Sequence, residues 1–170
     1  MKLNEILVRL ADFKVVFRAL RHRNFRLFFT GQSISLIGTW MQSVAMSWLV
    51  YRLTNSVFLL GIVGFLGQLP MLVAAPFAGV IADRHNRHRI VIITQSLAML
   101  QAFVLAGLVL THYIQVWHLI ALNFLLGLVN SFDIPVRQSF IVEMIEDRRD
   151  LSNAIAMNSS MVNVAKLLGP

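Results

Sequence analysis

The sequence contains no cysteine and few charged side chains. Of its 170 residues only 14% are Asp, Glu, Lys or Arg, whereas 57% are hydrophobic. Soluble globular domains carry about 25% charged residues, so this composition predicts a membrane protein. The absence of cysteine excludes disulfides and thiol chemistry.

Motifs for catalysis and for cofactor binding are also missing. The sequence has no GxxxxGK[ST] phosphate-binding loop, no HExxH zinc motif and no indicated Ser–His–Asp set. His85 and His88 stand three residues apart in a basic segment, but no third metal ligand accompanies them. We interpret them as basic loop residues, and we predict no enzyme, no cofactor and no metal site.

Acidic residues are scarce beside basic ones. The chain has 8 Asp and Glu against 15 Lys and Arg, a formal net charge of +7. Such an excess also occurs in nucleic-acid-binding proteins. Here the basic residues flank apolar segments, as the charges that orient membrane helices do. We therefore predict the lipid bilayer as a partner and no nucleic acid.

Long charge-free segments make up most of the chain. They cover residues 27–51, 53–82 and 90–132, and a transmembrane helix needs about 20 apolar residues. The third segment is long enough for two helices, with the polar residues 111–115 as their turn. A fifth, more polar segment follows. The predicted fold is an all-α membrane protein with helices at about 25–51, 57–82, 89–111, 116–136 and 151–170.

Residues 1–22 have a different pattern, in which apolar side chains at helical spacing oppose charged ones. This predicts a cytoplasmic amphipathic helix at the membrane interface, with a soluble helix packed on a partner as the alternative. Lys and Arg are concentrated in three segments: residues 1–26, 83–89 and 137–150. The positive-inside rule therefore places the N-terminus, the predicted loop of residues 83–89 and the predicted loop of residues 143–150 in the cytoplasm.

Polar side chains recur inside the apolar segments, where they are costly unless they meet a partner or a water-filled cavity. In the first, fourth and fifth predicted helices they share one face, which predicts a polar interior; hydrogen bonding between helices is the alternative. Lys166 lies too deep to extend to the interface, which favours a functional role. Candidates for a substrate or proton pathway are Gln32, Thr39, Gln42, Asn123, Asn163 and Lys166.

Two further features concern the predicted second and fourth helices. Glycines in residues 57–82 allow close helix approach, and Pro70 and Pro76 are expected to bend the helix. Asp133 and Arg137 are four residues apart, so the simplest account is that they pair with each other. The alternative is that Asp133 binds an arginine of residues 83–89 through a bond that holds one conformation and breaks in another.

The segment GVIADRHNRHR, residues 79–89, resembles motif A of the major facilitator superfamily, Gly-x-x-x-Asp-Arg-x-Gly-Arg-Arg. Four positions match the motif: Gly79, Asp83, Arg84 and Arg87. Asn86 stands in place of glycine and His88 in place of a base. Because asparagine is the best non-glycine residue for a left-handed backbone, we expect the turn to be kept.

Other segments are similar to the enterobactin-exporter-like and drug-efflux branch of that superfamily. They are RNFRLFFTGQSISLIGTWM, FDIPVRQSFI and LSNAIAMNSSMVNVAKLLGP. The final Gly169 and Pro170 resemble part of motif C, the exporter motif of the fifth helix. Ala156 and Ala165 occupy the first two glycine positions of that motif, so this match is partial.

The resemblance implies a twelve-helix fold in two halves with alternating access, of which residues 23–170 form part of the N-terminal half. It implies proton-coupled export of a siderophore, drug or other small molecule across the inner membrane of a bacterium. The fragment is expected to be inactive without the C-terminal half; the alternative is a non-transporting accessory protein or a truncated remnant.

The resemblance also implies a conformational lock on the cytoplasmic side. In it, Asp83 faces the opposite half and Arg87 pairs with Asp133 of the fourth helix. The residues assigned to the lock are Gly79, Asp83, Arg84, Arg87, Asp133 and Arg137.

Overall fold

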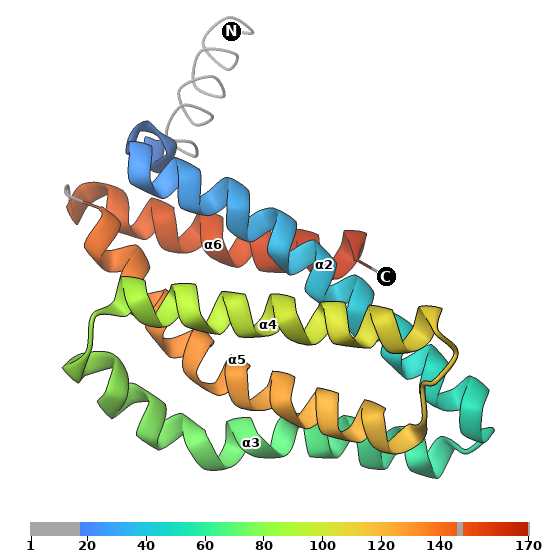
Figure 1. Ribbon diagram of the computed structural model, residues 1–170. Coiled ribbons are helices and arrows are strands. Elements are labelled where there is room, and N and C mark those ends of the chain that lie inside the picture. Colours follow the sequence, from blue (N-terminus) through green and yellow to red (C-terminus); the bar gives the residue numbers. More distant parts are fainter. Residues whose placement is uncertain (1–17, 146–147, 170) are drawn as a thin grey trace, which may run out of the picture. The chain divides into compact units, whose positions relative to one another are not determined.

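The computed structural model describes residues 18–145 and 148–169, and these residues are helical apart from short turns (Figure 1). The elements are a 3-10 helix η1 (Arg18–Arg21) and the α-helices α2 (Arg23–Thr54), α3 (Val57–Arg84), α4 (Arg87–Leu110), α5 (Val116–Met144) and α6 (Arg148–Leu168). The all-α class is therefore confirmed. Most of the predicted amphipathic helix, residues 1–17, lies outside the described residues.

Three of these helices are long and apolar enough to cross a membrane, within the residues that the structure describes. They are α3 over Val57–Ala74, α4 over Arg87–Leu110 and α5 over Val116–Met144. The two other long helices, α2 and α6, have a lower hydropathy because polar side chains are interspersed along them. The predicted turn at residues 111–115 is confirmed, since α4 ends at Leu110 and α5 begins at Val116.

The turn between α3 and α4 differs from the sequence prediction. It contains only His85 and Asn86, and most of the charges of residues 83–89 lie in the helix ends. The prediction of a left-handed Asn86 is wrong, because its φ is −65° and its ψ is 109°. Asn86 instead caps α4: its Oδ1 accepts a hydrogen bond from the backbone N–H of Arg89 at 3.2 Å. Asparagine is a preferred N-cap, so the residue suits this position for a different reason.

The end of the fourth predicted helix is also corrected. We expected it near residue 136, after Pro135, but α5 continues to Met144. Proline removes one helix hydrogen bond, yet the turns that follow are held by packing: Val136 is fully buried and Ile141 is 2% exposed. The predicted loop of residues 143–150 is therefore short, because α6 already begins at Arg148.

The chain forms two compact units. The first unit comprises the residues up to Met41 and those from Ile141 onward. In it η1, the start of α2 and α6 lie together (Figure 1). Its core contains Ala19, Phe25, Ile141, Ile145, Ala154 and Met157, with a second cluster of Leu36, Met161 and Ala165.

The second unit comprises Gln42–Phe140, that is, the rest of α2, all of α3 and α4, and most of α5. Its main core contains Met46, Val50, Val63, Leu105 and Leu119. A smaller cluster of Val91 and Val136, with Ile90 and Phe140 packed against it, joins α4 to α5.

Close contact between α3 and α5 depends on two glycines. A Cβ atom added at Gly127 of α5 would clash with the backbone carbonyl oxygen of Gly67 in α3. Beside them, Asn123 Nδ2 donates to the carbonyl oxygen of Val63 at 2.8 Å. Small residues thus permit the approach, as the sequence predicts for this helix. Pro70 and Pro76 lie inside α3, which bends along its length (Figure 1).

We predict that Gly127→Ala destabilises the second unit by about 1–3 kcal/mol, because a backbone atom of α3 cannot move aside as a flexible side chain would. The free energy of unfolding in mixed detergent micelles measures this. The control is Gly107→Ala in α4, where no atom lies within 4 Å of the added Cβ, and alanine should stabilise this helix by about 1 kcal/mol. Equal stability of the two variants would contradict the close α3–α5 contact.

Candidate functional site

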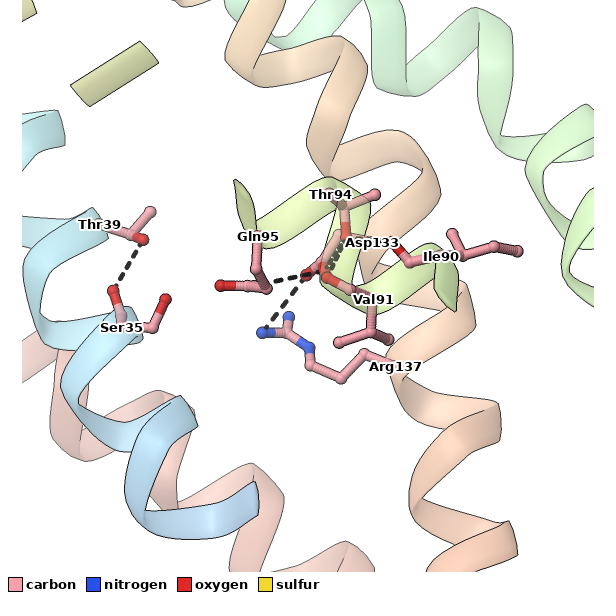
Figure 2. A network of polar contacts seen from close by, with 8 residues as sticks. All are labelled: Ser35, Thr39, Ile90, Val91, Thr94, Gln95, Asp133 and Arg137. Atoms are coloured by element: carbon pink, nitrogen blue, oxygen red, sulfur yellow. Dashed lines mark hydrogen bonds and ion pairs between the residues drawn. The ribbon is translucent and has the colours of Figure 1, made fainter. Parts of the chain in front are cut away.

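The candidate site is a buried carboxylate, Asp133 of α5, with partners on two helices (Figure 2). Asp133 is 3% exposed. Its Oδ1 accepts hydrogen bonds from Thr94 Oγ1 at 2.8 Å and from Gln95 Nε2 at 3.0 Å, both on α4. Its Oδ2 lies 3.6 Å from Arg137 Nη1, one turn further along α5. A carboxylate removed from water needs such partners to remain charged.

The local sequence of each helix produces this arrangement. Thr94 and Gln95 are adjacent, and both reach one oxygen of the carboxylate. Asp133 and Arg137 are at i and i+4, the spacing that brings side chains together on one helix face. The apolar cluster of Val91 and Val136 lies next to these residues in both helices and limits the access of water. The electrostatic attraction within the site is correspondingly stronger than at a surface.

Of the two pairings considered for Asp133, the structure shows the simpler one, with Arg137. Arg87, the first residue of α4, lies seven positions before Thr94. This separation is about two helical turns, so Arg87 belongs to the face of α4 that presents Thr94 to Asp133. Gly79, Asp83 and Arg84 form the last two turns of α3, and the structure describes Asp83 by its backbone only.

Two of the predicted pathway residues join helices of the second unit. Gln42 Nε2 of α2 donates to Gln101 Oε1 of α4 at 2.8 Å. Gln101 is 1% exposed and donates in turn to the carbonyl oxygen of Leu122 in α5 at 3.3 Å. Asn123 bonds the backbone of α3 as described above. For Gln42 and Asn123 the geometry is therefore that of hydrogen bonding between helices, the alternative considered for these positions.

The other four pathway candidates lie in the first unit. Gln32 is buried, and Thr39 Oγ1 donates to the carbonyl oxygen of Ser35 at 2.9 Å (Figure 2). Asn163 and Lys166 are exposed on α6, and Lys166 Nζ lies 5.3 Å from the centre of the Trp40 ring, within the range of a cation–π contact. An open groove between α2 and α6 lies in the same unit, lined by Phe29, Ser33, Ile37, Met157, Ser160, Met161, Val164 and Ala165.

The glycine of the partial motif C packs closely against α2. A Cβ atom added at Gly169 would clash with Cβ of Trp40 and would lie 3.2 Å from the carbonyl oxygen of Ile37. A larger residue at this position would therefore push the end of α6 away from α2. Pro170 lies outside the described residues.

Sequence reasoning missed a second buried carboxylate, in the first unit. Asp150, in the first turn of α6, is fully buried and lies 2.8 Å from Arg21 Nη2 and 3.1 Å from His22 Nε2. The backbone N–H of Ala19 donates to Asn153 Oδ1 at 3.0 Å. These contacts fasten η1 to the start of α6. The available signal was an acid in the first turn of a helix, where it is favoured.

The polar residues of α4 were missed for another reason. Thr94, Gln95 and Gln101 lie in the longest charge-free segment, residues 90–132, in which the consecutive polar residues at 111–115 form the most evident break. Thr94 and Gln101 are seven residues apart and share a helix face, and both are at most 5% exposed. That spacing was the signal that could have identified them.

Comparison with known families agrees with the motif. Residues 15–170 match the family model described as transmembrane secretion effector, a branch of the major facilitator superfamily. The chain belongs to this family. It is therefore an integral membrane protein of a transporter family and not an enzyme.

Two curated relatives illustrate the similarity. The staphyloferrin A transporter of Staphylococcus aureus is 26% identical over 146 residues, which are 85% of this chain and 36% of the relative. Macrolide efflux protein A of Streptococcus pyogenes is 24% identical over 154 residues, 88% of this chain and 38% of the relative. The chain thus spans little more than a third of the length of these relatives. No solved structure matches it.

We predict that Arg137→Gln destabilises the second unit by about 3 kcal/mol, because it leaves the buried Asp133 without its ion pair. Adding Asp133→Asn should restore part of the loss, since a neutral amide tolerates burial better than an unpaired charge. Thermal and denaturant unfolding of the three variants measures this. As a control, Arg52→Gln removes an exposed guanidinium over Trp48 and should cost less than about 1 kcal/mol. Equal effects of both arginine variants would contradict the buried pair.

Proposed function

We propose that this chain is the N-terminal part of a proton-coupled exporter that works by alternating access. The observation that carries the proposal is the family match over residues 15–170. The buried Asp133 supports it, because it pairs with Arg137 and is hydrogen-bonded to α4, the helix that follows the motif A turn. The names of the two relatives support a siderophore, drug or comparable small molecule as substrate.

In this proposal all five long helices span the inner membrane of a bacterium, with the N-terminus in the cytoplasm. The polar side chains of α2 and α6 then belong to the protein interior and not to the lipid face. The remaining helices of a twelve-helix fold would come from the part of the relatives that this chain does not cover. Gln32, Thr39, Asn163 and Lys166 are the pathway candidates on α2 and α6, where the groove described above lies.

The conformational lock is the mechanistic part of the proposal. Arg87 pairs with Asp133 in the locked state, while Asp83 faces the opposite half from the cytoplasmic end of α3. The position of Arg87 supports this, because Arg87 and Thr94 lie on the same face of α4, the face that presents Thr94 to Asp133. At Gly79, no atom of the described chain lies within 4 Å of an added Cβ, which leaves room for an approaching helix.

The coding sequence beyond codon 170 provides the first test of the transporter. An in-frame continuation with six or more further spans supports it, and a stop codon favours an accessory protein or a remnant. The 170-residue chain alone is expected to show no saturable, gradient-driven efflux in proteoliposomes. Such efflux would contradict the requirement for a second half.

In the complete transporter, Arg87→Asp and Asp133→Arg should each abolish most efflux, because each places two like charges at the lock. The exchanged pair, with both substitutions, should recover a measurable part of the activity. Efflux from loaded proteoliposomes under an imposed proton gradient is the assay. The control is Arg52→Gln in α2, which is distant in sequence from both residues of the pair and should keep full activity. No recovery in the exchanged pair would contradict a direct contact between Arg87 and Asp133.

A further inference from the structure

The hydroxyl of Thr94 has more acceptors than protons. Its Oγ1 lies 2.8 Å from Asp133 Oδ1 and 3.0 Å from each of the carbonyl oxygens of Ile90 and Val91 (Figure 2). A threonine hydroxyl carries one donor proton and two acceptor lone pairs. It therefore donates to one of these three oxygens at a time, and which one depends on the charge of Asp133.

When Asp133 is ionised, the hydroxyl of Thr94 donates to Oδ1, because a charged acceptor forms the stronger bond. When Oδ1 carries a proton, the carboxylic acid becomes the donor and Thr94 Oγ1 the acceptor. The Thr94 proton then turns to the carbonyl oxygen of Ile90 or Val91. In both states the hydroxyl of Thr94 and Oδ1 of Asp133 are hydrogen-bonded, and neither state requires the backbone to move.

Another threonine shows that the second state is an ordinary one. Thr30 Oγ1 of α2 lies 3.1 Å from the carbonyl oxygen of Arg26 and 3.0 Å from that of Leu27. These are the same two backbone contacts, to residues i−4 and i−3, that Thr94 makes. Thr30 is exposed, and within the part of the chain that the structure describes it has no carboxylate partner. Thr94 thus combines a common helix contact with a buried acid.

We infer that Asp133 is the residue that binds the coupling proton, and that Thr94 is a positioning residue that stabilises both its ionised and its protonated form. The inference rests on the proposed proton-coupled function and names the site of the proton. One proton is transferred from a hydronium ion to Oδ1: the new O–H bond forms on the carboxylate, an O–H bond of hydronium breaks and neutral water leaves. The net charge of the Asp133–Arg137 pair changes from zero to +1. Arg137 then loses its ionic partner, and so would Arg87 in the lock.

The groups around Asp133 are consistent with this role. Arg137 is the charged neighbour on α5, and Gln95 Nε2 is a neutral donor to Oδ1. The titratable and charged residues of α4 are confined to its first turn: Arg87, His88 and Arg89. The ring of His88 lies 5.7 Å from that of Phe140. The acid that hydrogen-bonds to Thr94 is Asp133.

Infrared difference spectroscopy of the chain in lipid bilayers tests the inference. Lowering the pH should produce the carbonyl-stretch band of a protonated carboxylic acid, and this band should be absent from Asp133→Asn. In Thr94→Val the band should shift to higher frequency, because the acid has lost its hydrogen-bond acceptor. Thr94→Ser, which keeps the hydroxyl, should retain the original frequency, and so should the matched control Thr30→Val.

The outcomes separate this inference from the transporter proposal. An unshifted band in Thr94→Val, or no band that depends on Asp133, would overturn the inference whether or not the complete protein transports. Failure of efflux in the complete protein, with the band and its shift present, would instead overturn the proposed function. The amide bands of the same spectra verify that each variant is folded. If Thr94→Val does not fold, Thr94→Ser still tests the inference: a shifted band in this variant, which keeps the hydroxyl, would overturn it.

Discussion

The structure depends on the solvation of one charge inside an apolar helix. Asp133 lies among residues that carry no other charge until Arg137, and an isolated carboxylate there would cost several kcal/mol. Thr94 and Gln95 supply donors from α4, and Arg137 supplies a cation from α5. Because these partners come from two helices, the carboxylate fixes how α4 and α5 are aligned along their length. Arg87, at the start of α4, lies on the helix face that also presents Thr94 to Asp133.

Polar contacts hold the rest of the second unit in the same manner. Gln42, Gln101 and the backbone at Leu122 link α2, α4 and α5, and Asn123 bonds the backbone of α3. In a bilayer, lipid is as apolar as a leucine side chain, so the hydrophobic effect does little to join helices. Interhelical hydrogen bonds and glycine contacts such as Gly67 with Gly127 take its place. A network of this kind resists sliding of one helix past another.

The sequence predicts the helices and most of their ends because charge-free length and turn residues determine them locally. Spacing alone also predicts that Asp133 and Arg137 share a helix face. The partners from α4 could not be predicted, since the alignment of two neighbouring helices does not follow from either sequence alone. The turn at Asn86 was misjudged because asparagine suits both a left-handed turn and an N-cap. Asp150 was taken as a loop charge, because the burial of η1 against α6 is a tertiary effect.

Solid-state NMR of the chain in lipid bilayers gives the most direct test of the paired carboxylate. With 13C-labelled aspartate and 15N-labelled arginine, dipolar recoupling detects contacts between a carboxylate carbon and a guanidinium nitrogen. Within residues 18–145 and 148–169 we predict two such contacts: Asp150 with Arg21, which serves as an internal reference, and Asp133 with Arg137. The second contact should disappear in both Asp133→Asn and Arg137→Gln while the reference remains. A spectrum that neither substitution changes would contradict the account.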